Sequence, residues 1–345
     1  MRASRITADG KGYYHCISRV VDRQMILGDV EREKFRELMR GVETFSGVRV
    51  LTYAILSNHF HILAEVPAKR ELGEAEIVER LAAMYDRREV VAILDQWALW
   101  RTHGLDTRVQ EEQDRLRVRM CDAGSFVKTV KQRFTQWYNR RKGRTGTLWE
   151  DRFKSVMIEP PSHALRERQS VGALATIAAY IDLNAVRAGI VSDPRDYAWC
   201  GYGEAVAGGK RAREGLALIF GEAHAGCWRT VASRYRHLID AAGPESGRTT
   251  GGAALPPTLT VKQVQQIVKQ RGELPLRDVL RCRVRYFSDG LAIGSKAFVN
   301  EVFQQHRDNF GPKRKDGARP LRFADWGGLC AARDLRLKPI AAPGG

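Results

Sequence analysis

Two histidines stand one residue apart in the apolar run SNHFHIL, residues 57–63. On a β-strand, residues i and i+2 project to the same face, so His59 and His61 would lie side by side while Phe60 and Ile62 face the core. Two neutral imidazoles that converge on one point can hold a divalent cation. A pair of half-exposed strand histidines without a metal explains the same short motif more simply, so the motif alone does not establish a metal site.

A metal at this pair needs a third ligand from elsewhere in the chain, because no further His or Cys lies nearby at the spacing of a zinc site. Two histidines and one oxygen ligand leave coordination positions open for water or a phosphate oxygen. That arrangement suits Mg²⁺ or Mn²⁺ acting as a Lewis acid on a phosphodiester.

A tyrosine and an asparagine share one face of an expected helix in AAYIDLNAVRAGIV, residues 178–191. The amide oxygen of Asn184 is a reasonable ligand for a hard cation, and the phenol of Tyr180 would then lie beside a metal-bound phosphate. Free tyrosine has a pKa of about 10, and a nearby cation favours its nucleophilic phenolate form. An ordinary half-buried helix tyrosine with a capping asparagine is the structural alternative. Tyr85, with Glu89 four residues later, is a weaker second candidate.

Basic and aromatic residues are interleaved between positions 128 and 154, where only Glu150 and Asp151 are acidic. A positive track accommodates a DNA backbone, and aromatic faces stack unpaired bases at about 1–3 kcal/mol per base. An amphipathic helix that buries its aromatic side chains explains the same pattern. We expect Phe134, Trp137 and Phe153 to lie mostly in the core. The side chains expected to contact phosphate are Lys128, Lys131, Arg133, Arg140, Arg141, Lys142, Arg144, Arg152 and Lys154.

The composition fits a nucleic-acid partner. The 345 residues include 57 Lys and Arg against 40 Asp and Glu, a formal net charge of +17, which favours a polyanionic partner. No apolar run is long enough to span a membrane, and the first residues lack an apolar signal region. The six cysteines are scattered without a CxxC pair, which argues against a zinc ribbon or a disulfide framework and for reduced thiols in the cytoplasm.

Hydrophobic periodicity predicts the elements that position these residues. The order at the start is strand, helix, strand, strand. The expected strands are 13–19, 48–56 and 59–66, and the expected helices are 31–46, a charged helical insert at about 71–119, 125–141 and 168–187.

The composition changes after residue 205. Residues 206–257 are rich in Gly and Ala and are expected to be a connection, with 243–257 as its linker. Residues 258–345 are expected to form a basic, mostly helical accessory domain, either DNA-binding or simply docked on the first domain.

Three blocks in this order, YAILSNHFHILAEV, GTLWEDRFKS and YIDLNAVRAGIV, resemble the REP-associated tyrosine transposases, which are IS200-like, single-tyrosine transposases of the HUH superfamily. The resemblance covers about residues 10–202. It implies that His59 and His61 are the HUH pair, Tyr180 the nucleophile and Asn184 the third metal ligand. The chain departs from the family pattern at Ala185, where the family commonly has proline, and at Asp151, where glycine is usual.

The resemblance also implies a fold and an activity. The fold is α+β, an antiparallel sheet with flanking helices on one side (a ferredoxin-like HUH endonuclease core over residues 1–205), followed by the mainly helical C-terminal unit. The activity is a metal-dependent transposase that cleaves and rejoins hairpin-containing single-stranded DNA through a 5′-phosphotyrosine link. It would use Mg²⁺ or Mn²⁺ without a nucleotide cofactor. The protein is expected to act on the nucleoid in the cytoplasm as a monomer or homodimer, without a membrane partner.

Three other functions remain open on the sequence. A replication initiator or relaxase-type nickase would use the same chemistry for another purpose. A non-catalytic DNA-binding regulator could descend from such an enzyme. A metal-dependent hydrolase that activates water would not need Tyr180.

Overall fold

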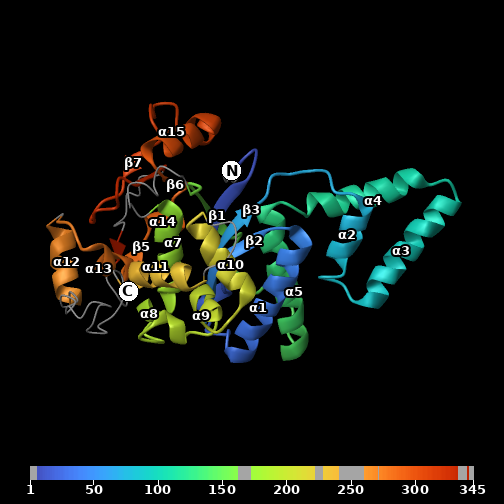
Figure 1. Ribbon diagram of the computed structural model, residues 1–345, viewed down its shortest axis with the longest axis horizontal. Coiled ribbons are helices and arrows are strands. Elements are labelled where there is room, and N and C mark those ends of the chain that lie inside the picture. The colour runs from blue at the N-terminus through green and yellow to red at the C-terminus, as the bar shows by residue number, and fades with distance from the viewer. Residues whose placement is uncertain are drawn as a thin grey trace.

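The computed structural model describes residues 6–161, 172–221, 228–240, 260–270, 272–332 and 340–341. These residues build a seven-stranded sheet with the order β2-β3-β1-β4-β6-β8-β7 (Figure 1). The strands of this sheet are β1 Gly12–Arg19, β2 Arg49–Ile55, β3 His59–Val66, β4 Lys154–Ile158, β6 Ala292–Gly294, β7 Arg319–Pro320 and β8 Cys330–Ala331.

Strand β3, which carries both histidines, lies inside the sheet between β2 and β1. It is antiparallel to β1, with Arg19 opposite His59 and Ile17 opposite His61. The three strands predicted at the start of the chain are confirmed to within a residue or two at each end. Among the described strands of this sheet, β4 and β6 form the parallel pair, so the predicted antiparallel sheet is mixed at this point.

Helices cover both faces of the sheet, whereas the sequence predicted helices on one side. Helix α1 (Asp29–Ser46) and helix α5 (Ala123–Lys142) pack on the face that receives Phe60 and Ile62, both fully buried. The opposite face is covered by α7 (Ala173–Asp182) and by α9 (Gly201–Val206) and α10 (Lys210–Ile219). Because side chains alternate along β3, the two histidines face the side of α7.

The helix expected over 168–187 is interrupted. Helix α7 ends at Asp182 and α8 (Asn184–Arg187) begins after Leu183, whose ψ angle of 0° departs from the helical value. The side chain of Asn184 bonds back to the carbonyl oxygen of Ile181, and this competition with the backbone accounts for the break. The first residues of the prediction, 168–171, lie outside the described residues.

Three helices form an arm that extends away from the sheet (Figure 1). They are α2 (Glu74–Leu81), α3 (Arg87–Thr102) and α4 (Asp106–Val118). Helix α3 begins with a capping box in which Asp86 and Glu89 bond each other's backbone NH groups. The arm covers the stretch of about 71–119 for which the sequence predicted a helical insert.

Residues 206–240 are not a simple connection, because they contain α10 and α11 (Trp228–Asp240). Helix α10 lies close against β2. A Cβ atom on Gly215 would stand 2.5 Å from the carbonyl oxygen of Leu51, so only glycine allows this approach. The small residues that suggested a linker thus serve a tight helix–sheet contact. The linker predicted at 243–257 lies outside the described residues.

The C-terminal residues are mainly helical, as predicted, and also extend the main sheet through β6, β8 and β7. A separate two-stranded sheet pairs β5 (Arg283–Val284) with β9 (Ile340–Ala341). The helices of the C-terminal residues are α12 Val261–Lys269, α13 Leu276–Leu280, α14 Tyr286–Asp289 and α15 Lys296–Gln305. Short 3-10 turns are η1 Val21–Arg23, η2 Pro194–Asp196 and η3 Arg307–Asn309.

Two sequence expectations concern the whole chain. None of the described helices combines the length and apolar character needed to cross a bilayer. The five described cysteines are free and buried, and Cys227 lies outside the described residues.

Candidate active site

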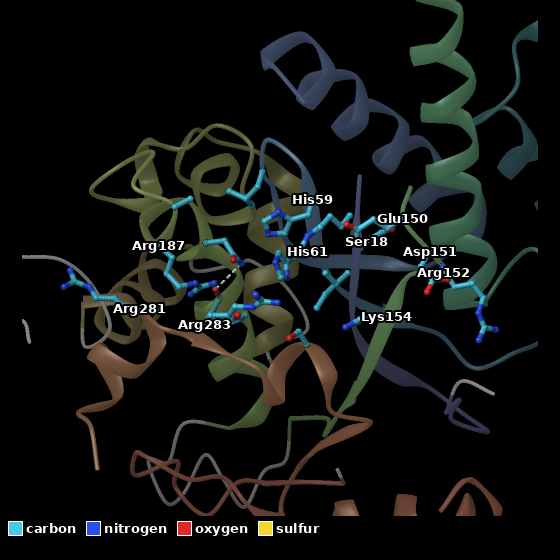
Figure 2. A pocket seen from close by; sticks show the side chains of 17 residues that line it. Ser18, His59, His61, Glu150, Asp151, Arg152, Lys154, Arg187, Arg281 and Arg283 are labelled. Carbon is cyan, nitrogen blue, oxygen red and sulfur yellow. Dashed lines mark hydrogen bonds between the residues drawn. The ribbon is translucent and has the colours of Figure 1, made fainter. Parts of the chain in front are cut away.

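A pocket of about 510 Å³ opens where β1 ends and β3 begins, beside α7 and α8 (Figure 2). It brings together His59, His61, Tyr180 and Asn184, the four residues singled out in the sequence. Tyr85, the weaker candidate, does not line this pocket; its hydroxyl contacts Arg119 at the base of the arm.

The ring orientation of His59 is fixed by its neighbour in the sequence. The side-chain nitrogen of Asn58 donates to the carbonyl oxygen of Arg23, which directs the Asn58 amide oxygen to the Nδ1 atom of His59 at 2.7 Å. An amide oxygen only accepts, so Nδ1 of His59 carries the proton. The Nε2 atom is therefore unprotonated in the neutral ring and has no hydrogen-bond partner among the described residues.

His61 is oriented through a longer chain of contacts. The Nδ1 atom of His15 lies 2.8 Å from the carbonyl oxygen of Phe287, so it is the donor. The Nε2 atom of His15 then accepts from Nδ1 of His61 at 2.9 Å. As in His59, this leaves Nε2 of His61 as the unprotonated nitrogen. Both histidines thus offer the same atom, in the form that a metal requires.

The three histidine rings are neutral at physiological pH. Burial lowers the pKa of His15 to about 3, with a further contribution from Arg187. The pKa of His59 is lowered to about 3 by burial and by the charges of Arg19, Arg283 and Arg187. Burial and the neighbouring rings hold the pKa of His61 well below its usual range. Neutral imidazoles are the form that binds a cation.

Asn184 supplies the oxygen. Its side-chain nitrogen donates to the carbonyl oxygens of Ile181 at 3.0 Å and of Tyr180 at 3.4 Å, so the amide oxygen is left without a partner among the described residues. Within the described chain, no three His, Cys, Asp or Glu side chains are grouped to hold a metal. The donor set present, two imidazole nitrogens and one amide oxygen, therefore fits a hard divalent cation that keeps open positions for other ligands.

The ring of Tyr180 is held on several sides and is 3% exposed. The ring of Phe287 packs edge-on at a centroid distance of 4.9 Å, and the guanidinium carbon of Arg187 lies 3.9 Å from the Tyr180 ring centroid. Arg187 also donates to the carbonyl oxygens of Tyr180 and Leu280, each at 2.7 Å. These contacts fix the position of the Tyr180 ring in the pocket.

Basic side chains dominate the rest of the pocket lining. Glu150 and Asp151 are its acidic members. The basic members are Arg19, Arg152, Lys154, Arg187, Arg281 and Arg283. A pocket with this balance attracts an anionic ligand such as a phosphodiester.

Residues 10–90 match the model of the family described as "Transposase IS200 like". These residues contain β1, β3 and both histidines. Over this part of the chain, the protein is similar to the IS200-like transposases. Among solved structures, one described as a REP-associated tyrosine transposase bound to a REP hairpin is similar, at 15% identity and a TM-score of 0.36, and the match covers 61% of this chain and 87% of that chain. No curated protein is similar enough to report as a relative.

The match confirms the resemblance drawn from the sequence at the level of the IS200-like transposases, a family of DNA-processing enzymes. It includes the histidine pair but ends before Tyr180 and Asn184. The roles of these two residues therefore rest on their place in the pocket and on the sequence block around them.

The nine basic residues predicted to contact DNA fall into different places around this pocket. Arg152 and Lys154 line it, and Lys154 forms an ion pair with Asp289. The others lie on α5 or just after it. Arg133 donates to the carbonyl oxygen of Met84 and is turned toward the arm. Lys131 on α5 and Arg144 just after it are half-buried. The exposed basic residues of α5 are Lys128, Arg140, Arg141 and Lys142.

The interleaved aromatic residues are mostly structural. Phe134 and Phe153 are buried, as expected, and Trp149 is buried with them. Trp149 packs against Phe35, Phe60 and Phe134 between the sheet and α5, whereas Trp137 is half-buried. The aromatic residues therefore hold α5 on the sheet, and stacking of bases on them is not needed to explain them.

Proposed function

We propose that this protein is a metal-dependent transposase that cleaves and rejoins hairpin-containing single-stranded DNA through a tyrosine nucleophile. One observation carries the proposal. Two strand histidines with unprotonated Nε2 atoms, one amide oxygen and one tyrosine converge in a single basic pocket. The match of residues 10–90 to the IS200-like transposases supports it.

His59, His61 and Asn184 would hold Mg²⁺ or Mn²⁺. When bound there, the cation supplies Lewis-acid polarisation of the scissile phosphate. The protein's part is to keep the three donor atoms oriented before the cation binds. Asn58 and His15 do this for the two rings, and the carbonyl oxygen of Ile181 does it for the amide.

Tyr180 would be the nucleophile. Its phenol oxygen forms a bond to phosphorus while the bond from phosphorus to the 3′ oxygen breaks, which gives a 5′-phosphotyrosine and a free 3′-hydroxyl. The guanidinium of Arg187 on the ring face holds the phenol in position for this attack. Attack of a DNA 3′-hydroxyl on the same link then frees Tyr180 and rejoins the strands, so no nucleotide cofactor is needed.

The test is a covalent adduct. Labelled single-stranded hairpin DNA with native flanking sequence is incubated with Mn²⁺ and the protein, and a denaturing gel resolves protein from DNA. We expect a labelled protein band that disappears with chelator, in Tyr180→Phe and in His59→Ala. Tyr85→Phe is the matched control, because that tyrosine lies outside the pocket, and it should retain the band.

Other outcomes separate the rival functions. Cleavage without a covalent band that persists in Tyr180→Phe would replace the proposal with a hydrolase that uses water. Binding of several hairpins with neither cleavage nor adduct would replace it with a regulator. An adduct that forms without any rejoining of strands would favour a nickase.

A further inference from the structure

The proposed reaction leaves unexplained why the C-terminal residues reach into the catalytic pocket. Arg281, Arg283 and Ser288 line the same pocket as the two histidines, although they follow them by more than two hundred residues (Figure 2). A DNA-binding accessory domain of separate function would have no need to do so.

The segment around Arg283 is fixed to the catalytic elements on both sides. Before it, the carbonyl oxygen of Leu280 accepts a bond from Arg187. After it, the carbonyl oxygen of Phe287 accepts from His15, and the Phe287 ring packs on Tyr180. Further along, β6 pairs with β4 in the main sheet. Arg283 is therefore held in place relative to the histidines and the tyrosine.

The strand pattern turns Arg283 toward the pocket. Cys282 and Val284 on either side of it are fully buried, whereas Arg283 is exposed. Because side chains alternate along a strand, the guanidinium points away from the buried face of β5. Figure 2 shows it near Arg187 and His61, while the side chain of Arg281 extends away from the histidines.

Three arginines from different elements line the pocket together with His59. They are Arg19 from β1, Arg187 from α8 and Arg283 from β5, and Glu150 is an acidic residue of the same lining. Arg283 forms neither an ion pair nor a side-chain hydrogen bond with any other described residue. Like charges gathered in this way are favourable when an anion lies between them.

We propose that Arg283, together with Arg19, binds a phosphate of the DNA strand beside the scissile phosphate, so that the C-terminal unit completes the substrate site. This inference rests on the proposed function for the identity of the strand. The ligand is a backbone phosphodiester, which guanidinium groups bind through paired hydrogen bonds.

The experiment measures DNA affinity and adduct formation separately. Affinity for single-stranded hairpin DNA is measured at several salt concentrations in the Tyr180→Phe background, where no cleavage takes place. Each phosphate contact contributes about 0.7 to the slope of log affinity against log salt on a single strand. Arg283→Gln should lower the slope by about 0.7 and weaken affinity about tenfold. Arg283→Lys should restore most of the slope.

Arg322→Gln is the matched control, because Arg322 is an exposed arginine of the same C-terminal unit outside the pocket. It should leave the affinity and its slope unchanged. With Tyr180 present and DNA saturating, Arg283→Gln should form the adduct at least about tenfold more slowly than Arg322→Gln. Circular dichroism checks that each variant is folded.

The inference is overturned if folded Arg283→Gln keeps the wild-type slope, or if it changes the slope no more than Arg322→Gln. A lowered slope with an unchanged adduct rate would place the phosphate contact away from the reacting centre and so also overturn it. Failure of the proposed function is distinguished by the wild-type protein, which would then form no adduct. The salt slope would still decide whether Arg283 contacts phosphate.

Discussion

At the scale of single residues, the geometry of the pocket depends on groups outside the histidine pair. Both histidines present Nε2 because Asn58 accepts from one ring and His15 accepts from the other. His15 can accept this bond only because the carbonyl oxygen of Phe287 keeps the proton of the His15 ring on Nδ1. The ligand atoms are thus determined by residues outside the pair.

Replacement of His15 by phenylalanine tests this orientation. The change keeps an aromatic ring in the sheet and removes the acceptor for His61, so the proton of His61 is free to occupy Nε2. Loss of such an orienting partner typically weakens metal binding about 10- to 100-fold. We expect this loss for Mn²⁺, measured without DNA by the electron paramagnetic resonance signal of the free ion.

His103→Phe on the arm is the control, since His103 is exposed and far from the pocket lining. It should bind Mn²⁺ as the wild type does. Equal Mn²⁺ affinity in folded His15→Phe and His103→Phe would show that the contact between His15 and His61 does not orient the ligand.

At the scale of elements, α7 must hold Tyr180 against β3, and a buried carboxylate at its end fixes it there. Asp182 accepts from the hydroxyl of Thr52 on β2 at 2.8 and 2.9 Å, from the backbone NH of Tyr202 at 3.1 Å and from the hydroxyl of Tyr235. Burial raises its pKa to about 6, which still leaves the group charged at neutral pH. One side chain thereby connects α7 with β2, α9 and α11.

Asp182→Ala should destabilise the protein by about 3 kcal/mol, because it leaves several buried donors without an acceptor. The free energy of unfolding in urea measures the loss. Asp182→Asn keeps an acceptor oxygen and should cost less, and Asp95→Ala on the exposed side of α3 should cost almost nothing. A loss in Asp182→Ala no larger than in Asp95→Ala would contradict this role.

Several strands and helices around the pocket were predictable from the sequence, whereas the contacts between them were not. The strand that carries His59 was predictable, because β-branched and aromatic residues alternate around it and turn residues precede it. The hydrogen-bond partner of His61 was not predictable from the sequence. His15 becomes its diagonal neighbour only through the pairing of β1 with β3, a contact between distant segments that no local pattern encodes. The close contact at Gly215 was not predictable either. A flexible linker and a close helix–sheet contact both require small residues, so the Gly and Ala content of this stretch predicted a linker.

At the scale of the whole molecule, basic residues lie at two kinds of place. The pocket arginines line the same pocket as the histidines and Tyr180, whereas the exposed basic residues of α5 lie along a helix on the other face of the sheet. Contacts of the first kind should affect the reaction rate, and contacts of the second kind should affect only how tightly DNA is held.

The double variant Arg140→Gln, Arg141→Gln tests the second kind of site. We expect weaker hairpin binding and a salt slope lower by about 0.9 for each duplex phosphate contact that is lost. The adduct rate at saturating DNA should be unchanged. The control is the double variant Lys210→Gln, Lys296→Gln, which removes two positive charges outside α5. It should leave the hairpin affinity with its salt slope, and the adduct rate, as in the wild type. Hairpin affinity that is equal in the two double variants would remove α5 from the DNA surface.

The bond between His15 and the carbonyl oxygen of Phe287 has a consequence for protein synthesis. When the ribosome has added the last of the histidine pair, the tyrosine and the asparagine, about a hundred residues remain before it reaches Phe287. A chain that stopped in this interval would contain the histidine pair, Tyr180 and Asn184, and it would still lack the carbonyl group that orients His15 and, through it, His61. Such an unfinished chain would therefore have all four pocket residues without a fixed proton position on His61.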